Sequence, residues 1–262
     1  MSTRANRNEQ ARRRQEAASR QRRTQRIRAI VAGGVAVALA GGMGLAALGS
    51  LNTPRATTPP AGTPSVAPAA APIVPQGANA SGDARGGAAG RDGTPTLTLY
   101  LDHQCPNCAV FEKEFGPLLA DTARAGDWTL QHKTMTFMDD NLGNDSSTRA
   151  AIAAACAADH GQHGPFTDAV LARQAGRDGF PDAVLREEVP AQVGLRGDAL
   201  AAFRACYDGR ATAGFVATVN ESALADGVKG TPTLAVDGTP VDLDAVDPFT
   251  PEGLKAYILA NA

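Results

Sequence analysis

The sequence predicts an α/β domain in the C-terminal two thirds of the chain, with a long helical insertion between its strands. An alternating polar and apolar segment, 96–101, runs into a Cys-Pro-Asn-Cys motif at 105–108 that opens a stretch of helical spacing. Helical patterns then fill about 146–226, and an apolar run with a turn signal follows them. The order strand, helix, strand, helical block, hairpin and helix is that of an α/β domain enlarged by inserted helices.

The first strand is expected over 96–101, where polar and apolar residues alternate on a β-branched background. The next helix is marked by Cys108, Phe111 and Phe115, which recur at helical spacing. A Gly-Pro pair at 116–117 is expected to kink this helix without ending it, because the pattern continues beyond the pair. A second strand is expected over 128–137.

The segment 146–226 is predicted to be mostly helical, with Gly and Pro at the breaks between helices. The expected helices lie near 147–159, 165–174, 182–193, 198–207 and 211–225. Residues 233–243 then have the composition of a tight hairpin, with Asp-Gly as the turn. A closing helix is expected over 251–261.

Composition divides the chain into unlike segments. All twelve aromatic residues and all four cysteines lie at or beyond position 100, so the first third lacks the side chains that build a core. Residues 1–28 hold ten Arg and two Glu, a net charge of +8, whereas the rest holds 15 basic and 25 acidic residues. The folded domain is therefore expected over 94–262. Because the basic region is only a short tail, nucleic acid is not an expected partner.

Residues 29–51 are predicted to form one transmembrane helix. These 23 uncharged residues would extend about 34 Å as a helix, enough for a hydrocarbon core of about 30 Å. The arginines of 1–28 place that tail in the cytoplasm, so the protein is expected in the cell membrane as a single-pass protein with an extracytoplasmic domain. A cleaved signal peptide and twin-arginine export are the alternatives, and both would still export the domain.

The segment 52–93 is predicted to be a disordered linker between the membrane helix and the domain. It contains seven prolines, many Ala, Gly and Thr, and almost no large apolar side chains. Such a chain cannot bury enough surface to fold. It would serve as a tether or as a spacer.

Cys105 and Cys108 are the candidate catalytic residues, with Pro106 and Asn107 as the dipeptide between them. A thiolate at a helix N-terminus is stabilised by free amides and the helix dipole, which can lower a thiol pKa from about 8.5 into a range of roughly 3.5–7.5. Cys105 is expected to be exposed and nucleophilic. Cys108, one turn later on the apolar face, is expected to be buried and to act as the resolving thiol.

Thr231 and Pro232 form a second candidate site. Thr-Pro pairs are frequent in this chain, but this pair directly precedes the apolar strand that enters the hairpin. A proline there removes one backbone donor, and a cis bond would leave the residue before it free to pair with a bound peptide.

These motifs resemble those of the DsbA-like thioredoxin-fold family, particularly its membrane-anchored, actinobacterial-type members. The resemblance covers 96–262 and rests on the motif at 105–108, on Gly-Thr-Pro at 230–232 and on the helical block between them. It implies a thioredoxin-like fold and an exported protein thiol–disulfide oxidoreductase, which works through a redox-active disulfide without a bound cofactor. Implied partners are exported proteins with thiols or disulfides, and a quinone-linked membrane protein of the DsbB or vitamin-K-epoxide-reductase kind.

Two departures from the family pattern concern redox strength. Strongly oxidising members carry a histidine where this chain has Asn107. The buried carboxylate of many thioredoxin-like proteins falls at Leu99 here, so Asp102 is only a possible substitute. Glu112 matches an acidic position of the family and is expected near the site. The departures leave the physiological direction of the reaction open.

Three histidines lie near candidate elements. His103 could tune the neighbouring thiolate, but a solvated loop histidine is the favoured interpretation. His160 and His163 flank a Gly-rich turn and are expected to be exposed.

Cys156 and Cys206 are expected to form a structural disulfide. Each shares a helix face with a large apolar residue, Ile152 or Phe203, so both thiols should point inward. A bond between them would close a loop of about 51 residues and stabilise the fold by about 4 kcal/mol in the chain-entropy model. Family members carry a comparable bridge, and two buried free thiols are the alternative.

The sequence thus predicts an oxidase, with several competing functions. The pair at 105 and 108 could be half of a zinc site, but no second CxxC motif exists and no metal site is predicted. It could be a purely structural disulfide, although such short loops are strained. A membrane-tethered reductase or isomerase would use the same cysteines. A non-catalytic binding module would keep the thioredoxin fold alone.

Overall fold

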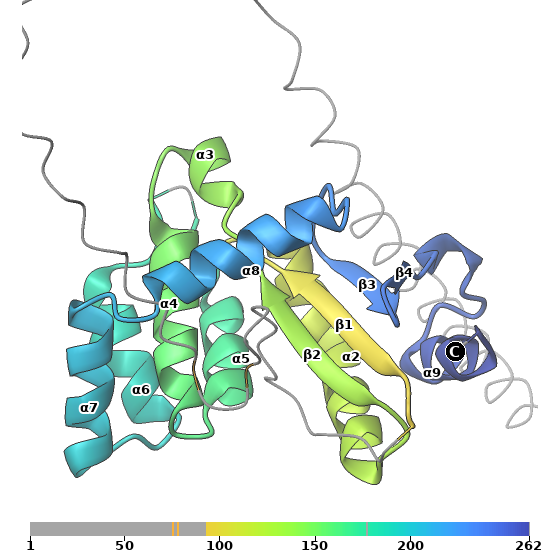
Figure 1. Ribbon diagram of the computed structural model, residues 1–262, viewed down its shortest axis with the longest axis horizontal. Helices are drawn as coiled ribbons and strands as arrows, with labels where there is room; N and C mark the ends of the chain where they lie inside the picture. Colours follow the sequence, from red (N-terminus) through yellow and green to blue (C-terminus); the bar gives the residue numbers. More distant parts are fainter. Residues whose placement is uncertain (1–74, 76–77, 79–92, 177, 262) are drawn as a thin grey trace, which may run out of the picture.

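The computed structural model describes residues 75, 78, 93–176 and 178–261, which build a four-stranded mixed sheet with helices on both faces and beside it (Figure 1). The strands, in the spatial order β2-β1-β3-β4, are β1 (Thr96–Leu101), β2 (Thr129–Thr134), β3 (Thr233–Val236) and β4 (Thr239–Pro240). β1 runs parallel to β2, with Leu97 opposite Leu130, and antiparallel to β3, with Leu97 opposite Val236. The expected first strand is therefore confirmed, and it lies inside the sheet.

The alternation along β1 decides which helices cover each face. Leu97, Leu99 and Leu101 point into the core that includes side chains of α2 (Pro106–Ala125) and α9 (Pro251–Asn261). Tyr100 points to the other face, where Ala223 of α8 (Ala213–Ala225) joins its cluster. Figure 1 shows α2 behind the sheet and α8 crossing in front of it.

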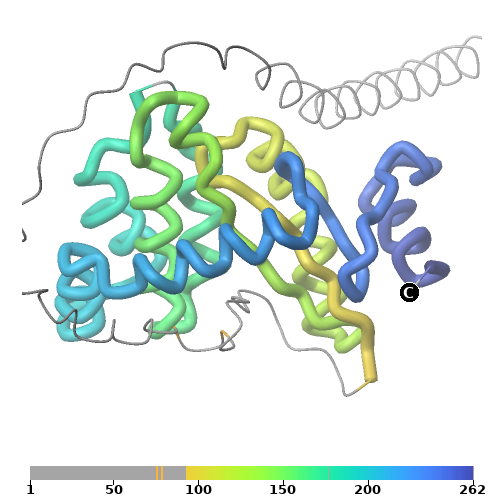
Figure 2. The backbone as a smooth tube through the Cα atoms, turned by 45° about the horizontal axis from the view of Figure 1, so that its top comes forward, coloured from red at the N-terminus to blue at the C-terminus, as the bar shows by residue number. Residues whose placement is uncertain are grey.

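A second core holds the helical block together, and Figure 2 shows this block side by side with the sheet. Its elements are α4 (Ser146–Ala158), α5 (His163–Arg173), the π-helical turn η1 (Val184–Glu188), α6 (Val189–Gln192) and α7 (Gly197–Asp208). Phe166 of α5 and Phe203 of α7 pack against each other, with ring centroids 5.8 Å apart. Ten of the thirteen α4 residues are buried, and they are mostly alanines. Small side chains let neighbouring helices approach α4 from several sides.

The hairpin is shorter than predicted: its second strand reaches only Pro240, although the Val241 N–H still donates to the Leu234 carbonyl at 2.8 Å. β4 ends there, and the chain continues into a short 3-10 helix, η2 (Leu243–Ala245). The Asp-Gly turn is present, with positive φ at both Asp237 (46°) and Gly238 (81°), as two-residue hairpins favour. The expected second strand, 128–137, is likewise trimmed to β2.

One helix was not predicted. α3 (Met138–Leu142) has only five residues and no apolar periodicity that could signal it. Its Asp139 accepts hydrogen bonds from the backbone amides of Ser147 (2.7 Å) and Thr148 (2.9 Å). This carboxylate therefore satisfies free amides in the first turn of α4.

The predicted tail 1–28 and membrane helix 29–51 lie outside the described residues. None of the helices in the described part of the chain is both long and apolar enough to cross a membrane. Of the predicted linker, the structure describes Pro75, Ala78 and Gly93, and Ala78 packs against the helical block.

Candidate active site

The Cys-Pro-Asn-Cys motif opens helix α2, as the sequence predicts. Cys105 is the N-cap residue, with extended φ and ψ of −76° and 116°, and Pro106 stands at the start of the helix, where its missing N–H is not needed. Cys108 lies one turn later, 1% exposed, among the apolar residues between α2 and the sheet. Both cysteines are free thiols in this structure.

The expectation that Cys105 is exposed is wrong. Its side chain is only 5% exposed, because the loop before β3 covers it. The Cys105 thiol donates a hydrogen bond to the backbone carbonyl of Thr231, 3.3 Å away. The following peptide bond, Thr231–Pro232, is cis. The second candidate site therefore lies directly against the first.

The environment of Cys105 favours its thiolate. A hydrogen bond from the Cys108 thiol is the largest cause, and it lowers the pKa of Cys105 to about 6 against the opposing effect of burial. Hydrogen bonding by the Thr231 side chain and by the amides of Asn107 and Cys108 acts in the same direction. Burial and the nearby Cys105 raise the pKa of Cys108 well above its ordinary value. The two thiols thus differ strongly in acidity, although both are buried.

Asp102 is fully buried three residues before the nucleophile. Burial raises its pKa to about 7, while three hydrogen bonds favour its charged form. It accepts these bonds from the Ser147 hydroxyl (2.6 Å) and from the amides of Gln104 (2.8 Å) and Met138 (3.1 Å). Asp102 therefore fastens the loop that leads into the motif to α3 and α4.

Gln104 strengthens the same connection, although no sequence motif pointed to it. Its side-chain amide donates to Asp139, Asn144 and Ser147, each at 2.9 Å. The partners lie 35 to 43 residues later in the chain. Only the folded helical block brings them to the loop.

Glu112 lies one turn beyond the motif on α2, where the family resemblance places an acidic residue. It is 8% exposed, and burial raises its pKa to about 7. Its Oε1 is 3.5 Å from Nε2 of His132 on β2, a neighbour that the sequence did not single out. Gly116 leaves the room for this carboxyl, because a Cβ at that position would overlap Oε2 of Glu112.

The predictions for two histidines are corrected by the structure. His103 is fully buried rather than solvated, and its Nε2 lies 3.4 Å from the Thr167 hydroxyl of α5. His163 is 5% exposed rather than on the surface, with its ring centroid 6.0 Å from that of His132. Burial lowers the pKa of His103 to about 3 and that of His132 to about 4. These imidazoles are therefore neutral at physiological pH, and His103 does not supply a positive charge to the thiolate.

Cys156 and Cys206 are joined by a disulfide that links α4 to α7. Their Cα atoms are 5.9 Å apart and the bridge spans 50 residues. Cys156 is 1% exposed and belongs to the core of the helical block. The two cysteine pairs thus belong to different cores of the molecule. Within the described residues, no group of three or more His, Cys, Asp or Glu side chains could hold a metal ion.

The comparisons with known proteins agree with this arrangement. A protein-family model described as Thioredoxin matches residues 88–260. The chain belongs to the thioredoxin family. A search of curated protein sequences finds no match.

Solved structures place the chain among the DsbA-like members of this family. The oxidised DsbA of Mycobacterium tuberculosis is 27% identical, with a TM-score of 0.52, over 65% of this chain and 86% of that protein. MdbA of Actinomyces oris, a thiol–disulfide oxidoreductase, has a TM-score of 0.59 at 20% identity, over 72% of this chain and 92% of that one. BdbD of Bacillus subtilis has a TM-score of 0.54 at 16% identity, over 71% and 96%. The last two show the shared fold, and the family resemblance drawn from the motifs is confirmed.

Proposed function

We propose that this protein is an extracytoplasmic thiol–disulfide oxidoreductase that acts as an oxidase, forming disulfides in exported proteins. The observation that carries the proposal is the contrast between its two motif thiols, because Cys105 has a pKa lowered to about 6 and Cys108 a raised one. An acidic thiol stabilises the reduced form of the pair, which makes its disulfide a stronger oxidant. The DsbA-like relatives support the same class of activity.

The chemistry starts from the oxidised pair. A substrate thiolate attacks the sulfur of Cys105, since Cys108 is almost fully buried behind it. The bond between the two cysteines breaks, and Cys108 leaves with the electron pair and takes up a proton. A second substrate thiolate then attacks the substrate sulfur of the mixed disulfide and expels Cys105. Expulsion of Cys105 is favoured because a thiol of low pKa leaves faster.

The products are a substrate disulfide and a reduced enzyme that has gained two electrons. We propose that the enzyme returns these electrons to a quinone-linked membrane partner of the DsbB or vitamin-K-epoxide-reductase kind, as the family resemblance implies. The proposal places the domain outside the cytoplasmic membrane, anchored by 29–51 with the basic tail 1–28 inside. The Cys156–Cys206 disulfide supports an oxidising compartment.

The test is oxidation of a reduced, unfolded dithiol protein by the full-length oxidised enzyme in detergent, followed by thiol counting in a mass spectrometer. We expect one substrate disulfide per enzyme and no reaction with Cys105→Ser. The reduction potential of the pair should lie between those of DsbA and thioredoxin, about −120 and about −270 mV, because its pKa lies between theirs. A potential at or below about −270 mV would indicate a reductase. A pair that does not cycle would indicate a binding module.

A further inference from the structure

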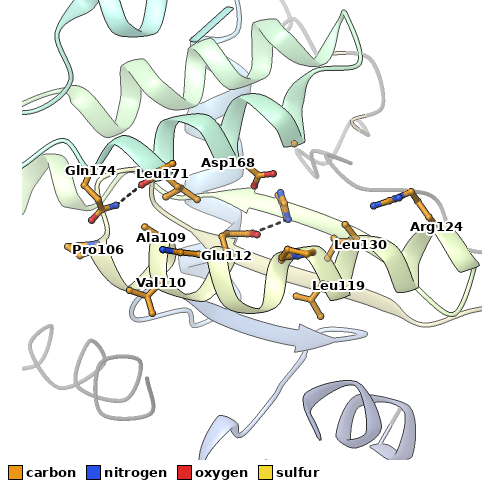
Figure 3. Close-up of a pocket in the computed structure, with 17 residues that line it drawn as sticks. Pro106, Ala109, Val110, Glu112, Leu119, Arg124, Leu130, Asp168, Leu171 and Gln174 are labelled. Carbon is orange, nitrogen blue, oxygen red and sulfur yellow. Dashed lines mark hydrogen bonds and ion pairs between the residues drawn. The ribbon is translucent and has the colours of Figure 1, made fainter. Parts of the chain in front are cut away.

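A large cavity lies directly beside the motif. Its volume is about 860 Å³, within the range of binding pockets, and it is lined by α2, β2 and α5 and open to solvent (Figure 3). It begins at Pro106, between the two motif cysteines, and follows α2 to Arg124. Most of its wall is apolar, including Ala109, Val110 and Leu171.

Two carboxyl groups face this cavity from opposite walls, Glu112 from α2 and Asp168 from α5 (Figure 3). Asp168 is exposed to solvent, yet partial burial of its carboxyl group and the nearby Glu112 raise its pKa to about 6. Glu112 disfavours the ionisation of Asp168, and a cation placed between the two carboxyl groups would relieve this effect.

The cavity wall also carries Lys113, whose exposed side chain makes no ion pair with Glu112 or Asp168 within the described residues. His132 has its Nε2 3.5 Å from Oε1 of Glu112, and burial keeps this imidazole neutral at physiological pH. Arg124, at the far end of the cavity, makes its ion pair with Asp121. The Glu112 side chain is more than nine-tenths buried, and its Oε1 has no hydrogen-bond partner in the described part of the chain. An acceptor left in this state calls for a donor from outside the described chain.

We infer that this cavity binds a lysine or arginine side chain of the substrate polypeptide, close in sequence to the cysteine that is being oxidised. The inference rests on the proposed function. Lysine and arginine lay their aliphatic stems on apolar walls while their charged ends reach an acceptor, which fits Ala109 and Val110 above Glu112 and Asp168.

The position of the cavity sets how near that residue must be. Glu112 is six residues beyond Pro106, which is about 9 Å along a helix. An extended peptide covers about 3.3 Å per residue, so a basic residue within about three positions of the reacting cysteine can reach the carboxyl pair.

The experiment uses the full-length oxidised protein and three dithiol peptides that differ only at a position two residues from the first cysteine. The position holds lysine, norleucine, which keeps the aliphatic stem without the charge, or glutamate. Stopped-flow measurement gives the second-order rate constant of oxidation for each peptide. We expect the lysine peptide to react about tenfold faster than the norleucine peptide, as one charge-assisted hydrogen bond to a buried acceptor would give, and the glutamate peptide to react slowest.

Variants locate the preference. In the double variant Glu112→Gln, Asp168→Asn the lysine to norleucine ratio should fall to about one. The control, Glu221→Gln, removes one carboxylate on α8, across the sheet, and should keep the ratio. Ratios within each variant remove any effect of Glu112 on the reactivity of Cys105 itself. Equal rates for the two peptides on the unmodified protein, or a ratio that survives the double variant, would overturn the inference.

A second measurement separates this inference from the proposed function. Cysteine-free versions of the lysine and norleucine peptides are titrated into the protein, and NMR follows the methyl groups of Ala109 and Leu171. Lysine-selective chemical shift changes that vanish in the double variant support the cavity site even if no peptide is oxidised. In that case only the proposed oxidase function would be overturned. Oxidation without any preference or shift removes only the cavity site.

Discussion

Three of the four cysteines of this chain are buried and Cys206 is partly buried, yet the two pairs differ in the properties that decide reactivity. Cys105 and Cys108 are three residues apart at the start of a helix and are present as thiols. Cys156 and Cys206 are 50 residues apart in two helices and are joined. Exposure does not separate the pairs, because the reactive Cys105 is only 5% exposed and Cys156 is 1% exposed.

The difference lies in the hydrogen bonds offered to sulfur. Cys105 has the Cys108 thiol, Thr231 and helix N-terminal amides around it, and together they hold its pKa near 6. Cys156 lies in the interior of α4, where the backbone amides are already bonded within the helix, and its recorded polar neighbour is the Thr212 hydroxyl at 3.8 Å. Position along a helix therefore predicts thiol reactivity better than burial does.

The largest effect should come from removing the structural pair. In Cys156→Ser, Cys206→Ser the bridge between α4 and α7 is lost, which should lower the free energy of unfolding by about 4 kcal/mol from loop entropy. The melting temperature should fall by roughly 8–16 °C for a domain of this size. The reduction potential of the other pair should not move. Scanning calorimetry and thiol counting in glutathione buffers check both statements.

A changed potential in that variant would break the comparison, because it would show that the bridge reaches the active site. The control is Cys108→Ser, in which the active-site pair can no longer form a disulfide but the bridge remains. Its melting temperature should stay close to that of the reduced unmodified protein, which also has no bond between 105 and 108.

Much of this contrast could be predicted from the sequence, because it rests on local chemistry. The motif, the helix behind it and the strand before it are adjacent in the chain, so spacing alone places Cys105 at a helix start. The Gly and Pro residues at the breaks between helices predicted the outline of the helical block. α9 begins and ends where expected.

What the sequence missed depends on contacts between distant segments. The burial of Cys105 comes from Thr231, 126 residues later. The burial of His103 comes from α5, and its Nε2 neighbour, Thr167, is 64 residues away. The carboxyl pair of Glu112 and Asp168 forms only when α5 packs on α2. No periodicity within one element carries such information.

The next prediction concerns Asp102, which connects the active-site loop to the helix that carries Cys156. Asp102 accepts a hydrogen bond from Ser147 on α4, the helix that also carries Cys156. In Asp102→Asn the new amide group would face the Met138 N–H, so one buried donor loses its acceptor, at about 1–3 kcal/mol. Urea unfolding of the oxidised protein measures this loss, with exposed Asp140→Asn on α3 as the control, expected within about 0.5 kcal/mol of the unmodified protein.

The pH dependence of the stability lost in Asp102→Asn follows from the raised pKa of Asp102. Folding raises the pKa of Asp102 from 3.8 to about 7, so the folded state prefers the protonated form. The stability that this carboxyl contributes is present below its unfolded pKa and is lost as the pH rises through the folded value. The deficit of Asp102→Asn should therefore be larger at about pH 5 than at about pH 8. A deficit that grows with pH would mean that the hydrogen bonds, and not burial, dominate at Asp102.

The last prediction tests the cause of the contrast itself. The pKa of Cys105 is lowered to about 6 chiefly by the Cys108 thiol, so Cys108→Ala should raise it toward the ordinary value of 9.0. Alkylation by iodoacetamide, followed as a function of pH, gives the midpoint directly, and Cys206→Ala in a Cys156→Ala background is the matched control that should not shift it.

In the unmodified reduced protein the lowered pKa of Cys105 contributes stability that is complete above about pH 9 and lost as the pH falls through about 6. The reduced form should therefore gain stability over the oxidised form between these values, and most of this gain should disappear in Cys108→Ala. A midpoint that stays near 6 in that variant would assign the effect to Thr231 and the helix amides instead, which would make position along the helix sufficient on its own.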